Sequence, residues 1–160
     1  MRALIQRVLS ASVEVDGQLT SSIDQGLLVL LGIGLEDTDE DTEYLINKII
    51  NLRIFSDGSG KFDLSAIDID AQILLISQFT LYADPRRGRR PSFLEAASPY
   101  NARHMFDKAV EGFTKTGLGV KTGQFQESML VSSRNDGPVT IMIDSKDRSL
   151  SKRSSNKQLL

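Results

Sequence analysis

The sequence predicts a strand-rich α+β domain, with two principal helices packed on one face of a mixed or antiparallel, barrel-like sheet. Three observations carry this prediction. Residues 2–15 alternate largely between apolar and polar, residues 27–31 form a short apolar run, and helical apolar spacing recurs in two segments. The 160 residues, of which 40% are hydrophobic and 25% charged, can bury one core, and no linker or repeat divides them.

Local sequence patterns predict the secondary structure of the first half of the chain. The acidic stretch 36–43 precedes apolar residues at helical spacing, and acids in a first turn favour the helix dipole. The run 27–31 is typical of a central strand covered on both faces. In chain order, we expect a strand over 2–15, a hairpin turn at Asp16-Gly17, a strand near 18–24, a strand over 27–31, a helix ending near Leu52 and a loop over 56–60.

The second half contains the other predicted helix. Ser98 is a good N-cap and Pro99 suits the first helical position. Residues 1–145 are expected to form the domain, and the polar, basic residues 146–160 a mobile tail. In chain order, we expect a strand over 72–79, an Arg-rich loop over 84–91, a helix from Pro99 to about Gly117, strands near 120–126 and 128–133, and a last strand starting at Pro138.

Composition excludes much catalytic chemistry. The chain has no cysteine and a single histidine, His104, which falls opposite the apolar stripe of its helix and is expected to face solvent. Gly32-Ile33-Gly34 precedes a helix, but Asp37 replaces the third glycine of a dinucleotide fingerprint and acids would repel a pyrophosphate. We therefore expect no cofactor and no metal site. No apolar stretch is long enough to span a membrane, and a cytoplasmic location is expected.

Charge is divided unevenly along the chain. Residues 1–83 contain 5 Lys/Arg and 13 Asp/Glu (a balance of −8), whereas residues 84–160 contain 14 and 8 (a balance of +6). Such asymmetry either solvates two separate surfaces or indicates a polyanionic partner for the second half. The strongest basic cluster follows the predicted strand over 72–79 and comprises Arg86, Arg87, Arg89 and Arg90.

Two polar motifs fit a purely structural interpretation poorly. Ser77-Gln78-Phe79-Thr80 ends an apolar strand with hydrogen-bonding side chains, and Asn135-x-Gly137-Pro138-Val139-Thr140 places proline at the predicted start of the last strand. Together they resemble the D-aminoacyl-tRNA deacylase family of the bacterial and eukaryotic type. The opening Met-Arg-Ala-x-Ile-Gln-Arg-Val and the segment Gly88-x-Arg90-Pro91-Ser92-Phe93 agree with the resemblance, which covers about residues 1–145.

The resemblance implies a function and a set of site residues. It implies a homodimer with active sites at the interface, which hydrolyses the ester between a D-amino acid, or glycine, and the terminal ribose of tRNA, and rejects L-aminoacyl-tRNA. Catalysis would fall to Ser77, Gln78, Phe79 and Thr80, with amides around Gln78 and Phe79 as an oxyanion hole. Substrate binding would involve the cis element Gly137-Pro138, inserted into the partner's site, and Arg7 holding its geometry.

Some alternatives stay open at this stage. Thr80 lacks an adjacent base, so we expect it to orient the substrate while the ribose 2′-hydroxyl and water react, but Thr80 as nucleophile is the competing view. The four loop arginines are expected to contact the tRNA acceptor end, with Lys146, Arg148, Lys152 and Arg153 as auxiliaries. A non-catalytic RNA- or DNA-binding dimer and a small-molecule esterase are the competing functions.

Overall fold

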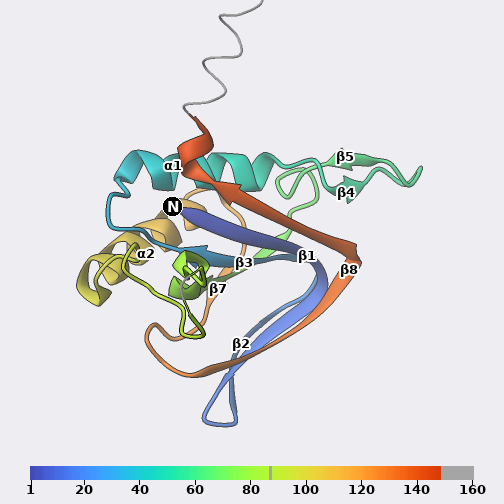
Figure 1. Cartoon of the computed structure of the whole chain (residues 1–160). Helices are drawn as coiled ribbons and strands as arrows, with labels where there is room; N and C mark the ends of the chain where they lie inside the picture. Colours follow the sequence, from blue (N-terminus) through green and yellow to red (C-terminus); the bar gives the residue numbers. More distant parts are fainter. Residues whose placement is uncertain (87, 149–160) are drawn as a thin grey trace, which may run out of the picture.

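The computed structural model describes residues 1–86 and 88–148. It is a single domain with a six-stranded mixed sheet, a separate two-stranded hairpin and two long helices (Figure 1). In chain order, the elements are β1 (Arg2–Val15), β2 (Gln18–Ile23), β3 (Gly26–Gly32), α1 (Asp39–Asn51), β4 (Phe55–Ser56), β5 (Phe62–Leu64), β6 (Gln72–Ser77), the 3₁₀ helix η1 (Phe79–Tyr82), α2 (Pro99–Thr114), β7 (Val120–Thr122), β8 (Met129–Asp144) and the 3₁₀ helix η2 (Ser145–Asp147).

The long, bent strand β1 organises the sheet. Its first half pairs antiparallel with β3 and its second half with β2, while β8 pairs with it over nearly its whole length. β6 runs parallel to β3, and β7 runs parallel to β6. The predicted fold class, with a mixed, barrel-like sheet, is therefore confirmed.

The core explains why the central strand is apolar throughout. Leu27, Val29 and Leu31 pack into the larger hydrophobic cluster under the helices, whereas Leu28 belongs to a second cluster on the other side of the sheet. The second cluster includes Val13 and other residues from the bent end of β1, so the sheet partly closes on itself. β3 is thus covered on both faces, as its sequence predicts.

Both predicted helices begin where capping chemistry places them. Thr38 and Asp41 form a reciprocal capping box at the start of α1. The Ser98 hydroxyl accepts a hydrogen bond from the Asn101 amide, and Pro99 occupies the first turn of α2. His104 is exposed on α2, as expected from its position opposite the apolar stripe. No helix in the described part of the chain is long and apolar enough to cross a membrane.

Four features of the second half differ from the sequence prediction. The expected strand over 72–79 ends at Ser77, and the expected strand over 120–126 ends at Thr122. The last two predicted strands are one strand, β8. Residues 146–148, predicted to begin the tail, instead continue the domain, because η2 follows β8 directly and Arg148 pairs with Glu40 of α1. Lys152 and Arg153 lie outside the described residues.

Candidate active site at two strand irregularities

The first motif lies where β6 passes into η1. The Gln78 amide donates to the Leu31 carbonyl (2.8 Å), which extends the β3–β6 ladder by one residue. The chain then turns, because the Leu81 amide bonds back to the Gln78 carbonyl (3.3 Å). This turn places Phe79, whose exposed fraction is 55%, and Thr80 on the surface.

The same turn decides which amides can stabilise an anion. The Gln78 amide already has the Leu31 carbonyl as its acceptor, so this half of the expected oxyanion hole is engaged. The Phe79 and Thr80 amides head η1, and the first N–H groups of a helix have no intrahelical acceptor. The pair of amides best placed for an oxyanion is therefore Phe79 and Thr80 rather than Gln78 and Phe79.

The Thr80 hydroxyl has an amide as its neighbour rather than a base. The side-chain Nε2 of Gln78 donates to Thr80 Oγ1. A donor on the hydroxyl oxygen reduces its electron density, which is the opposite of what a general base does for a nucleophile. The hydroxyl hydrogen remains available to donate to a substrate oxygen. The arrangement suits a Thr80 side chain that orients the substrate.

An apolar cavity opens beside this motif. Its volume is about 590 Å³, within the usual range for small-ligand pockets. The rings of Phe79 and Phe93 meet edge to face at its mouth, with centroids 4.9 Å apart. The walls come from the end of β6, the segment before α2, the first turn of α2 and the β7–β8 connection, and they include Ser77, Gln78, Ala97, Phe125, Gln126 and Met129.

The second motif interrupts the β1–β8 ladder. The pairing shifts register between Gln6 and Val8 of β1, and the Gly137-Pro138 peptide bond lies opposite this shift. That peptide bond is cis, Gly137 has a φ of +124°, and both residues are exposed. The motif is therefore a bulge inside one long strand and not the start of a separate strand, since a proline cannot donate to the ladder.

Asn135 closes this bulge, a role that the sequence did not indicate. Its Oδ1 accepts from the Val139 amide (2.9 Å) and its Nδ2 donates to Thr140 Oγ1 (2.9 Å). One side chain thus joins both ends of the segment that carries Gly137. Because the Asn135 amide accepts one hydrogen bond and donates another, it fixes the exposed main chain between residues 135 and 140.

Arg7 lies beneath the bulge and is nearly buried, with an exposed fraction of 8%. Its Nε lies 3.1 Å from the Asp136 carbonyl oxygen and 3.0 Å from the Asp136 carboxylate, and its Nη1 donates to the Ile54 carbonyl. A Cβ added to Gly137 would stand 3.0 Å from Arg7 Nη2. Arg7 therefore contacts the carbonyl before Gly137 and also fills the space beside that glycine.

The two motifs lie apart within one chain. Through β3, the first motif is level with Ala3 of β1, because Ser77 pairs with Leu31 and Leu31 pairs with Ala3. The second motif lies near Arg7, on the edge of β1 that pairs with β8. Four residues of a strand span about 13 Å, and three strand spacings of about 4.8 Å separate β8 from β6. A ligand small enough for the cavity cannot reach both motifs of the same chain.

The Arg-rich loop lies directly after η1. Asp84 and Ser92 close it through two backbone hydrogen bonds (2.8 and 2.9 Å). Arg86 makes a two-point pair with the Asp84 carboxylate, and these hydrogen bonds lower the pKa of Asp84 to about 2. Arg89 and Arg90 are exposed, whereas Arg87 lies outside the described residues.

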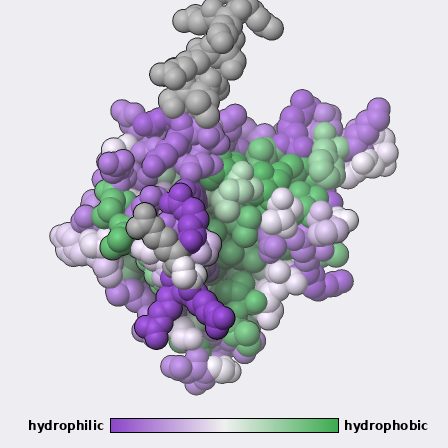
Figure 2. Space-filling view, in the orientation of Figure 1, coloured by the Kyte–Doolittle hydropathy of each residue, from purple (hydrophilic) through white to green (hydrophobic). Residues whose placement is uncertain are grey.

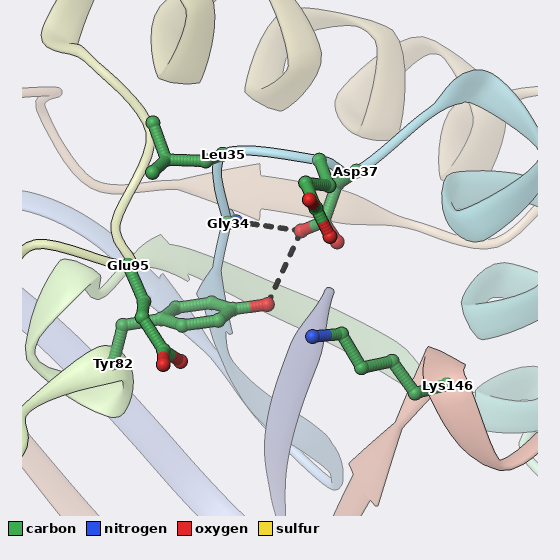
Figure 3. Close-up of a pocket in the computed structure, with 7 residues that line it drawn as sticks. Gly34, Leu35, Asp37, Tyr82, Glu95 and Lys146 are labelled. Carbon is green, nitrogen blue, oxygen red and sulfur yellow. Dashed lines mark hydrogen bonds between the residues drawn. The ribbon is translucent and has the colours of Figure 1, made fainter.

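A second, smaller pocket of about 250 Å³ lies behind η1 (Figure 3). There the Tyr82 hydroxyl points at Asp37 and donates to its Oδ2 (3.3 Å), which also accepts from the Gly34 amide (2.6 Å). Burial, reinforced by the Asp37 charge, raises the pKa of Tyr82 above its usual value. A Cβ on Gly34 would stand 2.7 Å from the Tyr82 oxygen. These contacts anchor η1 from behind.

Metal ligation has no obvious location in the described part of the chain. No group of three or more His, Asp or Glu side chains is placed there to hold an ion. The chemistry that the two motifs offer is accordingly that of main-chain N–H and C=O groups, one hydroxyl and an apolar cavity.

The architecture matches solved structures along almost the whole chain. One, described as a probable eukaryotic D-amino acid tRNA deacylase, superposes with a TM-score of 0.78 over 89% of this chain and 98% of its own, at 16% identity, and so shows a shared fold. Another, described as a c-Myc DNA unwinding element binding protein, gives a TM-score of 0.85 at 42% identity over 90% and 98% of the two chains. Both matches therefore show that the α+β architecture is shared over almost the whole chain.

Sequence comparison names the family. Residues 4–144 match the family model of D-Tyr-tRNA(Tyr) deacylase, and the chain belongs to this family. A D-aminoacyl-tRNA deacylase of Thermosipho melanesiensis is 54% identical over 91% of this chain and 98% of its own length. One of Aquifex aeolicus is 53% identical over 92% and 99%. The family resemblance expected from the two motifs is confirmed.

Proposed function

We propose that this chain hydrolyses the ester between a D-amino acid and the terminal ribose of tRNA, at a site formed by the Phe79–Thr80 main chain and the adjacent cavity. Family membership makes the chain a D-aminoacyl-tRNA deacylase, and close relatives carry that activity in their names. The observation that supports this location most strongly is the juxtaposition of unpaired helix-start amides with an apolar cavity large enough for a nucleoside. We place the reaction in the cytoplasm.

The cavity suits the terminal nucleoside of the substrate. Single-stranded nucleotides are commonly bound by stacking on aromatic rings, and Phe79 and Phe93 offer such rings at the mouth. A base held there would leave its ribose ester near the Phe79 and Thr80 amides. The ester carbonyl would then receive main-chain donors as negative charge develops on its oxygen.

The reaction is completed by water. Water attacks the ester carbonyl carbon, the bond to the ribose oxygen breaks, and that oxygen takes a proton to leave tRNA and free amino acid. Thr80 orients the substrate, because its oxygen already accepts a hydrogen bond from Gln78. The neighbouring ribose 2′-hydroxyl supplies the proton relay that the protein side chains do not.

Gly137 and Pro138 act as the chirality filter. Their exposed main chain is braced by Asn135 from above and by Arg7 from below. Carbonyl oxygens of such a segment can accept the substrate α-ammonium, and rigid main chain leaves no room where an L side chain would point. Because the exclusion depends only on where a side chain is attached to Cα, and glycine has no side chain, glycyl-tRNA should also be hydrolysed.

The filter and the catalytic motif come from different subunits of a homodimer. The distance between the two motifs within one chain supports this proposal, because a second copy would let both motifs touch one substrate. Exposed apolar side chains on β1 and β8 support such an interface: Leu9, Leu130 and Met142 are 44%, 64% and 51% exposed. Figure 2 shows apolar residues gathered over this part of the molecule.

The Arg-rich loop contacts the acceptor end of tRNA. Arg89 and Arg90 are exposed beside the catalytic motif, and Arg87 is proposed here on its sequence position alone. Arg86 contributes less, because Asp84 already neutralises it. Lys146 and Arg148 sit on η2 and its end, and Arg148 is paired with Glu40, so their part is auxiliary.

A second candidate function is nucleic-acid binding without catalysis. The neighbour described as a DNA unwinding element binding protein favours it, as do the exposed loop arginines. One assay separates the candidates: release of labelled amino acid from matched D- and L-aminoacyl-tRNA, with a free D-amino-acid ester beside them. Release from D-aminoacyl-tRNA alone supports the deacylase. Binding without release supports the second function, and equal cleavage of the free ester supports a small-molecule esterase.

A further inference from the structure

The β4–β5 hairpin stands apart from the main sheet, at the far right of Figure 1. The sequence predicts only a loop at its tip, over residues 56–60. The hairpin nevertheless reaches β1 at one side chain, Arg7. The Ile54 carbonyl, just before β4, accepts from Arg7 Nη1, and the ring of Phe62 in β5 lies under the Arg7 guanidinium.

The hairpin contacts Arg7 at its Nη1 and at the guanidinium plane, whereas Arg7 Nη2 faces Gly137. The guanidinium carbon lies 5.0 Å from the Phe62 ring centroid, inside the range of a cation–π interaction. Nε faces the Asp136 carbonyl and carboxylate instead. The Arg7 side chain therefore contacts both the hairpin and the segment that carries the filter.

The hairpin position also controls the space beside Gly137. Arg7 Nη2 stands 3.0 Å from the position of a Gly137 Cβ, so a guanidinium that moves away would open that space. Phe62 is 55% exposed although its side chain is large and apolar. Its position is thus not explained by burial in the core, whereas its contact with Arg7 is direct.

We infer that Phe62 is a positioning residue for chiral selection, which holds Arg7 against the Asp136 carbonyl and thereby fixes Gly137. This inference rests on the proposed role of Gly137 as the filter. It makes the β4–β5 hairpin, which is separate from the main sheet, a determinant of specificity. Substrate discrimination would then depend on residue 62 more than turnover does.

The test compares three variants by kcat/KM on D- and L-aminoacyl-tRNA made from the same tRNA. Phe62→Ala should lower the D-to-L ratio about two- to fivefold, the size of a partly exposed cation–π contact. Phe62→Tyr should keep the ratio because a ring remains, and Phe62→Leu should resemble Phe62→Ala because apolar bulk without a ring cannot replace it. Leu19→Ala, another exposed apolar side chain (65%), is the matched control.

A spectroscopic measurement reports on Arg7 directly. The Arg7 Nε–H resonance, identified by its disappearance in Arg7→Lys, should shift in Phe62→Ala and Phe62→Leu but not in Leu19→Ala, since only the former lose the ring. An unchanged D-to-L ratio in Phe62→Ala would overturn the inference. Arg7→Ala separates the inference about Phe62 from the proposed filter on which it rests. If D/L discrimination is lost in Arg7→Ala but kept in Phe62→Ala, only the role of Phe62 is refuted. If discrimination is intact in Arg7→Ala, the proposed filter itself is refuted.

Discussion

Replacing Gly137 by alanine tests the filter through its geometry. The φ of +124° is a region that L residues rarely adopt, at a cost of about 1–3 kcal/mol. The new Cβ would stand 2.8 Å from Val139 Cγ2 and 3.0 Å from Arg7 Nη2, against an optimum of about 3.5–4.0 Å for carbon contacts. The segment must therefore move by roughly 0.7 Å or more. A displacement near 1 Å can lower a rate about 10²-fold.

The assay measures kcat/KM on D-aminoacyl-tRNA together with the melting temperature. We expect Gly137→Ala to lose about 10²-fold in kcat/KM while Tm falls by roughly 2–12 °C, from about 2–4 °C per kcal/mol for a chain of this size. Gly17→Ala is the matched control, because Gly17 also has a positive φ (+74°) but nothing within 4 Å of its added Cβ. That control should lower Tm without changing activity. A Gly137→Ala enzyme within threefold of the parent would show that the geometry at Gly137 does not govern the reaction.

Three further predictions concern the catalytic motif and the Arg-rich loop. Thr80→Ala should keep much of its kcat, and a 10⁴-fold loss with the fold intact would show that Thr80 is the nucleophile. Gln at both Arg89 and Arg90 should flatten the plot of log K for tRNA against log salt by about 1.4 to 1.8, as two lost phosphate contacts require; an unchanged slope contradicts it. Asp84→Asn should tighten tRNA binding at neutral pH, measured by filter retention. With its pKa lowered to about 2 by the Arg86 hydrogen bonds, Asp84 is charged there and opposes the phosphates, so weaker binding would count against this loop as the contact.

Local chemistry accounts for what the sequence predicts well. Helix starts depend on neighbours in the chain, and both the acidic first turn of α1 and the Ser98-Pro99 start of α2 are visible within a few residues. The uninterrupted apolar run in β3 likewise predicts that this strand is buried on both faces. The two candidate motifs stand out locally as well, because one places polar side chains where an apolar strand ends and the other places a proline at a predicted strand start.

Features that depend on distant partners could not be predicted in this way. The bulge at Gly137 arises from its pairing with β1, more than a hundred residues away, so the sequence suggests a strand start instead. Arg7 shares the alternating inward face of Ala3 and Ile5, a signal that it is buried, but its partners Asp136 and Ile54 are non-local. The engagement of the Gln78 amide likewise depends on pairing with β3, which the motif itself does not encode.

Three substrates distinguish a main chain that excludes an L side chain from a site that recognises a D side chain. Glycyl-, D-alanyl- and L-alanyl-tRNA, made on the same tRNA, differ only by the presence and position of one methyl group. We expect kcat/KM for the glycyl and D-alanyl substrates to agree within about tenfold, which corresponds to about 1.36 kcal/mol, while the L-alanyl substrate is hydrolysed far more slowly. Equal rates for L- and D-alanyl-tRNA, or a glycyl substrate as poor as the L-alanyl one, would contradict this expectation.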